Sequence, residues 1–263
     1  MISDLKITLI QSSLFWENKE KNLEQFSDKI DSVKEPTDLI ILPEMFTTGF
    51  SMNTKTLAEP LNGATLSWLK KKAVQKSAAI TGSFVCEENG KYFNRLIWMN
   101  ADATYSIYDK RHLFRMGDEN NNYSSGNKKL IVELKGWKIC PLICYDLRFP
   151  VWSRNEKGIN NYDLLIYVAN WPERRAHAWK TLLLARAIEN QCYIAGVNRV
   201  GEDYNAIMHS GDSAVINAKG DIVSNIKAYQ EITETIILKK HELTDFRKQF
   251  PVLLDADDFE ITN

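Results

Sequence analysis

The sequence has no excess of either charge. Its 33 Lys and Arg residues are balanced by 34 Asp and Glu residues, which gives a formal net charge of −1. Proteins that bind nucleic acid need a strongly basic surface to neutralise phosphates. We therefore expect no nucleic-acid partner.

Long hydrophobic runs are also missing. A membrane-spanning helix needs about 20 predominantly apolar residues, and no stretch of this chain approaches that length. The first apolar run, LKITLI at 5–10, is interrupted by Lys6 and Thr8 and does not have the pattern of a signal peptide. We expect a cytoplasmic protein with no membrane partner.

Cysteines are few. The four lie at 86, 140, 144 and 192, with no CxxC pair and no spacing typical of a metal site. In a chain of this size without a secretion signal they are expected to be reduced thiols. We expect no metal and no cofactor, and three of these thiols, Cys86, Cys140 and Cys192, to be inert.

Apolar runs of strand length alternate with amphipathic runs of helix length along all 263 residues. Helices are expected at 18–33, 65–78 and 172–190, and another from about Asp146. The expected strands are 5–11, 38–44, 79–87, 92–100, 104–110, 130–136, 137–145, 162–170, 192–198, 212–221 and 232–240. The dipeptide Asn89-Gly90 predicts a hairpin turn between two of them.

This order of elements predicts an α/β fold. Several strands follow one another without a helix between them, which indicates mixed pairing rather than pure βαβ winding. A core of one sheet packed on another, with helices outside, fits the pattern best. Nothing in the sequence divides the chain, so we expect a single domain over 1–263.

Three polar residues lie where expected strands end, the usual place for an active site in an α/β protein. Glu44 follows LIILP, Lys110 follows TYSIYD, and Cys144 follows KICPLI. Each has an ordinary alternative, because Glu and Lys at such positions are often solvated and Cys often packs as a small apolar residue. The combination of all three residues is stronger evidence for an active site than any one of them.

Together the three residues fit nucleophilic catalysis. A thiol needs a base or a cationic environment to become a nucleophile. The helix expected from Asp146 and the Lys110 ammonium would lower the pKa of the Cys144 thiol, and Glu44 could accept its proton. A papain-like Cys–His pair remains an alternative, although the sequence singles out none of the histidines at 112, 177, 209 and 241.

These residues lie in three recognisable blocks. LPEMFTTGF around Glu44, YDKRHLF around Lys110 and CYDLRFPVWSR from Cys144 resemble, in this order, the catalytic blocks of the nitrilase superfamily, the carbon–nitrogen hydrolases. The similarity runs over about 5–240 and leaves a C-terminal tail at 241–263. YDKRHLFRMGDE, YVANWP and GDSAVIN are most similar to bacterial omega-amidases.

The resemblance implies a four-layer α-β-β-α sandwich with mixed sheets and outer helices. It also implies that Cys144 is the nucleophile, Glu44 the general base and Lys110 the cation that stabilises the tetrahedral intermediate. Glu119 corresponds to a second glutamate, although its neighbour Asp118 leaves that alignment open. The backbone N–H of Tyr145 is expected to contribute to the oxyanion hole.

The implied substrate is the terminal carboxamide of a small 2-oxo dicarboxylic acid monoamide, such as 2-oxoglutaramate or 2-oxosuccinamate. Its far carboxylate calls for a guanidinium, for which Arg115, Arg148 and Arg175 are candidates with structural roles as the alternative. Trp171 could form a wall of the pocket. The resemblance also implies a homodimer.

Two alternative functions stay open. The chain could be another enzyme of the same superfamily, such as a nitrilase, a carbamoyl-amine hydrolase or an amidase for a different acid. It could also be a non-catalytic scaffold that keeps the fold.

Overall fold

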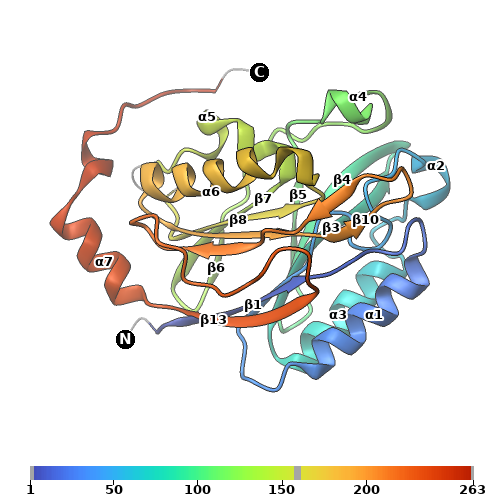
Figure 1. Cartoon of the computed structure of the whole chain (residues 1–263), viewed down its shortest axis with the longest axis horizontal. Helices are drawn as coiled ribbons and strands as arrows, with labels where there is room; N and C mark the ends of the chain where they lie inside the picture. Colours follow the sequence, from blue (N-terminus) through green and yellow to red (C-terminus); the bar gives the residue numbers. More distant parts are fainter. Residues whose placement is uncertain (1–2, 157–160, 262–263) are drawn as a thin grey trace.

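The computed structural model describes residues 3–156 and 161–261 of the chain. Two β-sheets pack face to face, and helices lie against their outer faces (Figure 1). The predicted α/β sandwich with mixed sheets is therefore confirmed. The single domain predicted for 1–263 stays a prediction, and strands of both sheets contribute to one buried apolar cluster.

The first sheet has the strand order β13-β1-β2-β3-β4-β5. β2 pairs in parallel with β1 and β3, and the other pairs are antiparallel. The strands are β1 (Leu5–Gln11), β2 (Leu39–Ile41), β3 (Ala79–Glu88), β4 (Lys91–Met99), β5 (Tyr105–Asp109) and β13 (Ile232–Leu238). Asn89 and Gly90 join β3 to β4 with φ of 54° and 73°, so the predicted hairpin is confirmed.

The second sheet has the order β12-β9-β8-β7-β6, with parallel pairing between β7, β8 and β9. Its strands are β6 (Val132–Leu134), β7 (Trp137–Ile143), β8 (Leu164–Ala169), β9 (Tyr193–Asn198) and β12 (Ala214–Ile216). β8 is apolar throughout and fully buried, as expected for a central parallel strand that is covered on both faces.

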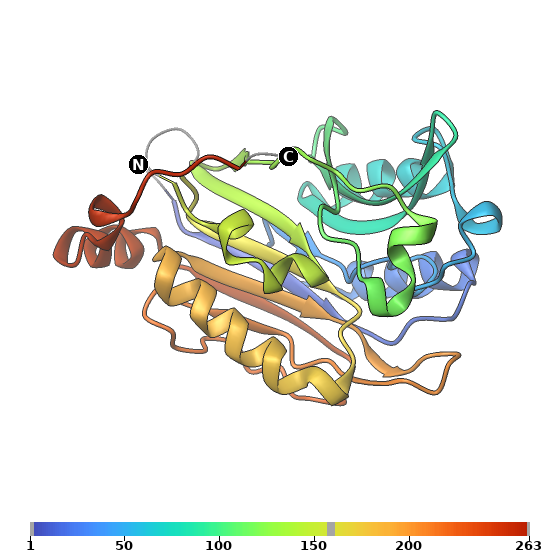
Figure 2. The same ribbon diagram turned by 90° about the horizontal axis from the view of Figure 1, so that it is seen from above.

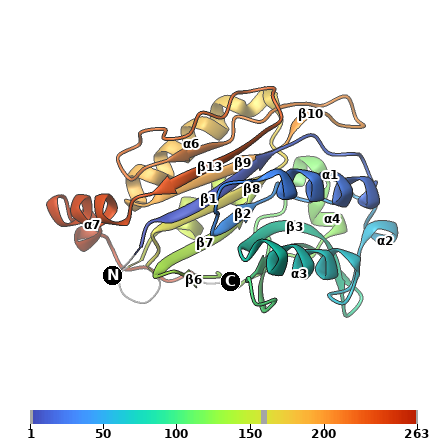
Figure 3. The ribbon, with the colours of Figure 1, turned by 90° about the horizontal axis from the view of Figure 1, so that it is seen from below.

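Each sheet packs on the other sheet with one face and on helices with its other face, because successive side chains along a strand point to opposite sides. In β1, Ile7 and Leu9 face the second sheet, whereas Ile10 packs with Phe26 of helix α1 (Lys19–Ser32). Helix α3 (Ala64–Lys76) lies beside α1 on this outer face, and α6 (Ala176–Asn190) covers the second sheet on the opposite side (Figure 3).

The helix expected from Asp146 is wrong in length and kind. A 3-10 segment, η2 (Cys144–Arg148), is followed by the short helix α5 (Pro150–Ser153). The cause is Pro150, because the residue before a proline is disfavoured in the helical region. Phe149 accordingly has φ −114° and ψ 89°.

Short or polar elements escaped the sequence analysis. These are the hairpin β10 (Val200–Glu202) and β11 (Met208–Ser210), the helix α7 (Lys240–Gln249), and the single turns α2 (Thr54–Leu57), α4 (Glu119–Asn122), η1 (Arg115–Gly117) and η5 (Val252–Asp255). The helix expected at 172–190 begins with the turn η4 (Glu173–Arg175) and continues as α6. The red helix α7 lies at one end of the molecule, away from α1 and α3 (Figure 2). In the described part of the chain, no helix combines the length and apolar character that crossing a bilayer requires.

Candidate active site

The three strand-end residues predicted from the sequence meet at one place. Glu44 follows β2, Lys110 follows β5, and Cys144 is the first residue after β7. The backbone turns sharply at two of these points, since Cys144 and Met45 have φ of 42° and 43°. Left-handed backbone at non-glycine residues is costly and concentrates at functional sites.

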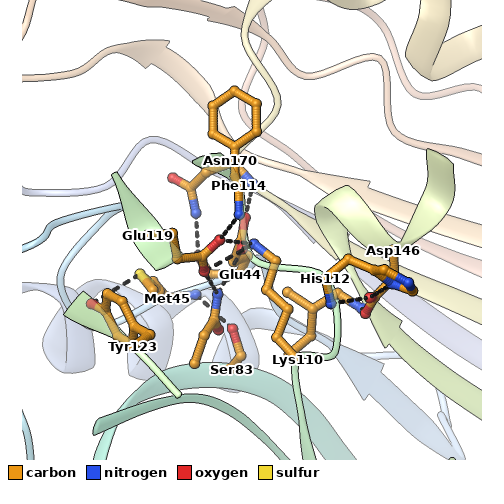
Figure 4. Close-up of polar contacts among 12 residues, drawn as sticks. Glu44, Met45, Ser83, Lys110, His112, Phe114, Glu119, Tyr123, Asp146 and Asn170 are labelled. Atoms are coloured by element: carbon orange, nitrogen blue, oxygen red, sulfur yellow. Dashed lines mark hydrogen bonds and ion pairs between the residues drawn. The ribbon is translucent and has the colours of Figure 1, made fainter. Parts of the chain in front are cut away.

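Lys110 forms a buried ion cluster with two glutamates (Figure 4). Its Nζ donates to Glu44 Oε1 at 2.8 Å and to both carboxylate oxygens of Glu119, at 3.0 and 2.9 Å. All three side chains are fully buried. Asp118, the alternative in the sequence, is exposed and bonds to Asn121 and Asn122 instead.

Two asparagines that the sequence analysis missed also hold this cluster. Asn94 Nδ2 donates to Glu44 Oε1 at 2.8 Å and to Glu119 Oε1 at 3.1 Å. Asn170 donates its backbone N–H to Glu44 Oε2 at 2.8 Å and its side-chain amide to the Glu44 backbone oxygen. Asn94 lies inside the apolar run of β4, and a polar residue there signals a buried hydrogen-bonding role.

The electrostatics around the thiol differ from the expectation. Burial raises the Cys144 pKa well above its usual value, and the charge of Glu44 adds to this effect while Lys110 opposes it. The predicted lowering of this pKa is therefore wrong. The long helix whose dipole was expected to help is absent from this part of the described chain, and the nearest charge is a carboxylate that can accept the thiol proton.

The Lys110 ammonium and the carboxylates around it favour each other's charged forms. Burial disfavours the Lys110 ammonium, but the charges of Glu119 and Glu44 outweigh it and raise the Lys110 pKa. Burial also raises the pKa of Glu119, an effect that Lys110 opposes. The lysine thus stays cationic at the centre of the site.

A third buried carboxylate, that of Asp146, fixes the turn at the thiol. Asp146 Oδ2 accepts the N–H of Ile143 at 3.1 Å and the hydroxyl of Tyr108 at 2.7 Å. Asp146 Oδ1 lies 2.8 Å from Nδ1 of His112, which stacks on Phe149 (Figure 4). Nδ1 of this histidine is thus occupied by Asp146, and the thiol of Cys144 has the Glu44 carboxylate as its hydrogen-bond partner. His209 lines the same cavity as Cys144, so the assignment of Glu44 as the base stays a prediction.

Cys144, Lys110 and Tyr145 line one cavity of about 830 Å³. The Tyr145 ring packs edge-on against Phe114 at 5.1 Å and Phe149 at 5.2 Å between ring centres. Its backbone N–H belongs to the first turn of η2, where N–H groups have no acceptor within the helix. This N–H is available to an oxyanion formed next to the Cys144 sulfur.

Three guanidiniums, Arg148, Arg174 and Arg175, line the same cavity, and we call them the arginine wall. No ion pair to any of them is found within the described residues. Arg148 lies over the Trp171 ring at 5.0 Å and Arg175 over the Phe114 ring at 5.0 Å.

Trp171 supports the arginine wall and also lines the cavity. Its indole N–H donates to the backbone oxygen of Arg175 at 2.8 Å, and its backbone N–H donates to Asn198 Oδ1 at 2.7 Å. Arg175 and Trp171 both line the cavity, and their predicted contact with a substrate stays a prediction.

Arg115 is not among the residues that line the cavity. It is exposed in the single turn η1, and the cavity is lined by its neighbours Phe114, Met116 and Gly117 instead. In a 3-10 turn successive side chains point about 120° apart, so these neighbours can face the cavity while Arg115 does not. The role of Arg115 as a substrate contact therefore stays a prediction, which the cavity lining does not support.

The remaining cysteines are separate from the cavity. Cys86, Cys140 and Cys192 are buried, and burial raises the pKa of Cys86 to about 11 and that of Cys140 to about 12. Cys144 shares this raised pKa, so what sets the other three thiols apart is that they do not line the cavity. Residues 3–156 and 161–261 contain no group of three His, Cys, Asp or Glu side chains placed to hold a metal ion.

Comparison with known sequences agrees with this geometry. The sequence model described as carbon-nitrogen hydrolase matches residues 6–245. The chain is 46% identical to "Omega-amidase YafV" of Escherichia coli K12 over 257 residues, 98% of each protein. It is 32% identical to "2-oxoglutaramate amidase" of Bacillus subtilis over 95% of this chain and 96% of that protein.

A solved structure is similar throughout. The protein XC1258 of Xanthomonas campestris, a CN-hydrolase superfamily protein with an arsenic adduct in its active site, is 44% identical, with a TM-score of 0.97. The match covers 99% of this chain and 100% of that one. Nit3 of Saccharomyces cerevisiae, a nitrilase-superfamily member, shares the fold at 24% identity and a TM-score of 0.83.

Proposed function

Because the chain belongs to the carbon–nitrogen hydrolase family, we propose that its cavity hydrolyses the terminal amide of a small 2-oxo dicarboxylic acid monoamide. The observation that carries the proposal is the meeting of a thiol, a base and an ammonium at a cavity with an unpaired arginine wall. The curated relatives named omega-amidase and 2-oxoglutaramate amidase support this substrate class.

In the first half of the reaction, Glu44 accepts the thiol proton as the Cys144 sulfur attacks the carboxamide carbon. The Lys110 ammonium and the Tyr145 N–H stabilise the oxyanion, and each such donor commonly lowers a barrier by about 3 kcal/mol. Collapse of the intermediate breaks the C–N bond. Glu44 returns the proton to the leaving nitrogen, so ammonia departs and a thioester remains on Cys144.

The second half reverses the proton movement. Water enters the place of ammonia, and Glu44 removes its proton as the oxygen attacks the thioester carbon. The second oxyanion uses the same donors. Its collapse breaks the C–S bond, releases the carboxylic acid and returns the proton to the sulfur. Glu119 takes part by holding Lys110 between two carboxylates.

The arginine wall suits the carboxylate at the other end of the substrate. Guanidinium groups bind carboxylates with two parallel hydrogen bonds, and Arg175 and Arg148 rest on aromatic rings that orient their planes. The wall also favours an anionic acid over a neutral or cationic amide. This preference distinguishes the proposed substrate from a simple nitrile or a carbamoylated amine.

Steady-state kinetics test the substrate. We expect kcat/KM for 2-oxoglutaramate to exceed that for glutamine, a small nitrile and a carbamoylated amine by at least about 100-fold, a difference of about 2.7 kcal/mol. If one of the other compounds is the better substrate by that margin, the chain is a different enzyme of the family.

Selective labelling tests catalysis against the scaffold alternative. A labelled electrophile should modify Cys144 much faster than Cys86, Cys140 and Cys192, because only Cys144 lines the cavity and faces a base. Equal labelling of all four thiols would favour a scaffold without activity.

The homodimer and the cytoplasmic location remain proposals that rest on the resemblance and the sequence. Light scattering of the purified chain should give the mass of two copies, and a monomer at micromolar concentration would rule the homodimer out.

A further inference from the structure

We propose that Asn94 is a positioning residue for the reaction, whose existing hydrogen bonds to Glu44 and Glu119 remain in place while Lys110 turns toward the oxyanion. The inference rests on the proposed function and deepens it. Asn94 lies on β4, is fully buried and is not part of the cavity lining. It therefore acts through the residues that it holds.

All the hydrogen bonds of the Lys110 ammonium go to carboxylate oxygens. An ammonium has three N–H donors, and Nζ has three such oxygens within 3.0 Å, one on Glu44 and two on Glu119. To stabilise an oxyanion in the cavity, Lys110 must withdraw at least one donor from a buried carboxylate. A buried carboxylate that loses a donor carries a large desolvation penalty.

Asn94 duplicates two of these contacts. Glu44 Oε1 accepts from both Lys110 and Asn94 at 2.8 Å, and Glu119 Oε1 accepts from Lys110 at 3.0 Å and from Asn94 at 3.1 Å. When Lys110 releases either oxygen, the Asn94 amide still satisfies it. Neither carboxylate oxygen is therefore left without a hydrogen-bond donor when Lys110 turns away.

The orientation of the Asn94 amide follows from its neighbours. Both atoms that it faces are carboxylate oxygens that also accept from an ammonium, so Nδ2 rather than Oδ1 must point at them. Oδ1 consequently has no hydrogen-bond partner among the described residues. A buried acceptor without a partner destabilises a fold.

The backbone of Asn94 adds a third connection. Its carbonyl oxygen accepts the backbone N–H of Lys110 at 3.0 Å, which fixes the lysine at the end of β5. One residue thus touches the proposed base, the proposed oxyanion cation and the second glutamate.

Removing Asn94 should also change the pH dependence. The charged and titratable groups that face Glu44 and Glu119 are Lys110 at the end of β5, Cys144 of η2 and Tyr123 after α4. Hydrogen bonds from Asn94 favour the ionised carboxylates. Without its bond from Asn94, Glu119, whose pKa burial already raises, gains a proton at higher pH, so the acid limb of the rate profile moves upward.

The test is Asn94→Leu, similar in size but without donors. Its kcat for 2-oxoglutaramate should fall about 100-fold while KM stays within about threefold, and the acid limb of kcat/KM should move up by about one pH unit. Thr81→Val is the matched control. Thr81 is buried on β3 and its hydroxyl has no partner among the described residues, so kinetics and pH profile should be unchanged.

Alkylation of Cys144 by iodoacetamide provides a readout that needs no amide substrate. Its acid limb should move upward in Asn94→Leu and stay in place in Thr81→Val. If the unmodified chain fails to hydrolyse 2-oxoglutaramate, this arm still tests Asn94, so the two failures are distinguishable. If Asn94→Leu does not fold, Asn94→Ser carries the same expectations.

Two results would overturn the proposal. One is a kcat within fivefold of the unmodified chain. The other is a lower kcat with both acid limbs unmoved, since a merely structural loss reduces activity without changing the carboxylates' ionisation.

Discussion

The two polar regions of the cavity are built differently. The cluster of Lys110, Glu44 and Glu119 is fully buried, and each carboxylate oxygen bonds a donor. The arginine wall is partly solvated and forms no ion pair within the described residues. The buried cluster is thus organised before a substrate arrives, whereas in the proposed reaction the arginines receive their counter-charge from the substrate itself. Variants in the cluster should change kcat, and variants in the wall should change KM.

The largest effect is expected for Cys144→Ala. Loss of the nucleophile should reduce kcat at least about 10⁴-fold, because the remaining groups cannot form the thioester. Alanine tolerates the left-handed φ about as well as cysteine, so the thermal midpoint should change little. Turnover by mass spectrometry and circular dichroism check both parts, and appreciable activity would remove Cys144 from the mechanism.

Lys110→Met should follow, with a loss of about 10³-fold in kcat. This change removes the oxyanion cation and leaves Glu44 and Glu119 buried together without a counter-charge, so the thermal midpoint should fall as well. Glu119→Gln in the same background relieves the repulsion and should restore stability without restoring activity. A double variant that recovers turnover would contradict the role given to the lysine.

A smaller and different effect is expected for Arg175→Met. KM for 2-oxoglutaramate should rise about 30-fold, about 2 kcal/mol, with kcat within about fivefold. The same variant should lose nothing toward an amide that lacks the far carboxylate. A fall in kcat at constant KM would mean that Arg175 belongs functionally with the cluster.

The smallest effect is expected for Arg115→Ala, which serves as the control for Arg175. This arginine is exposed and lies outside the cavity lining. Both kcat and KM should stay within about twofold of the unmodified chain. A rise in KM comparable to that of Arg175→Met would show that Arg115 reaches the substrate.

The fold was predictable where one periodicity dominated. Runs such as LKITLIQ and YDLLIYVAN are long and apolar, and they form β1 and β8 as expected. The hairpin β10–β11 and helix α7 were missed because their strands are short or their faces mostly polar. The 3-10 turn at Cys144 depends on Pro150, a local effect that overrides the expected helix.

The site was predictable where chemistry singled out a residue type. Cys144, Glu44 and Lys110 each follow a strand, and the packing of the first sheet (β2 and β5) on the second (β7) brings those strand ends together. The contacts of Asn94 and Asn170 could not be predicted from sequence alone, because their partners lie 25 to 126 residues away along the chain. Sequence alone could not distinguish Arg115 from Arg175. Both lie in short 3-10 turns, η1 and η4, and of the two only Arg175 lines the cavity.

Helix α7 has a bearing on where the chain can be shortened. Lys240 and Arg247 both pair with Asp163, a buried carboxylate just before β8. Cutting the chain at 239 would remove both cations and leave the negative charge of Asp163 without a partner beside β8, the central strand of the second sheet. Helix α7 therefore supplies the counter-charges of a buried carboxylate, and a chain shortened at 239 should also carry Asp163→Asn.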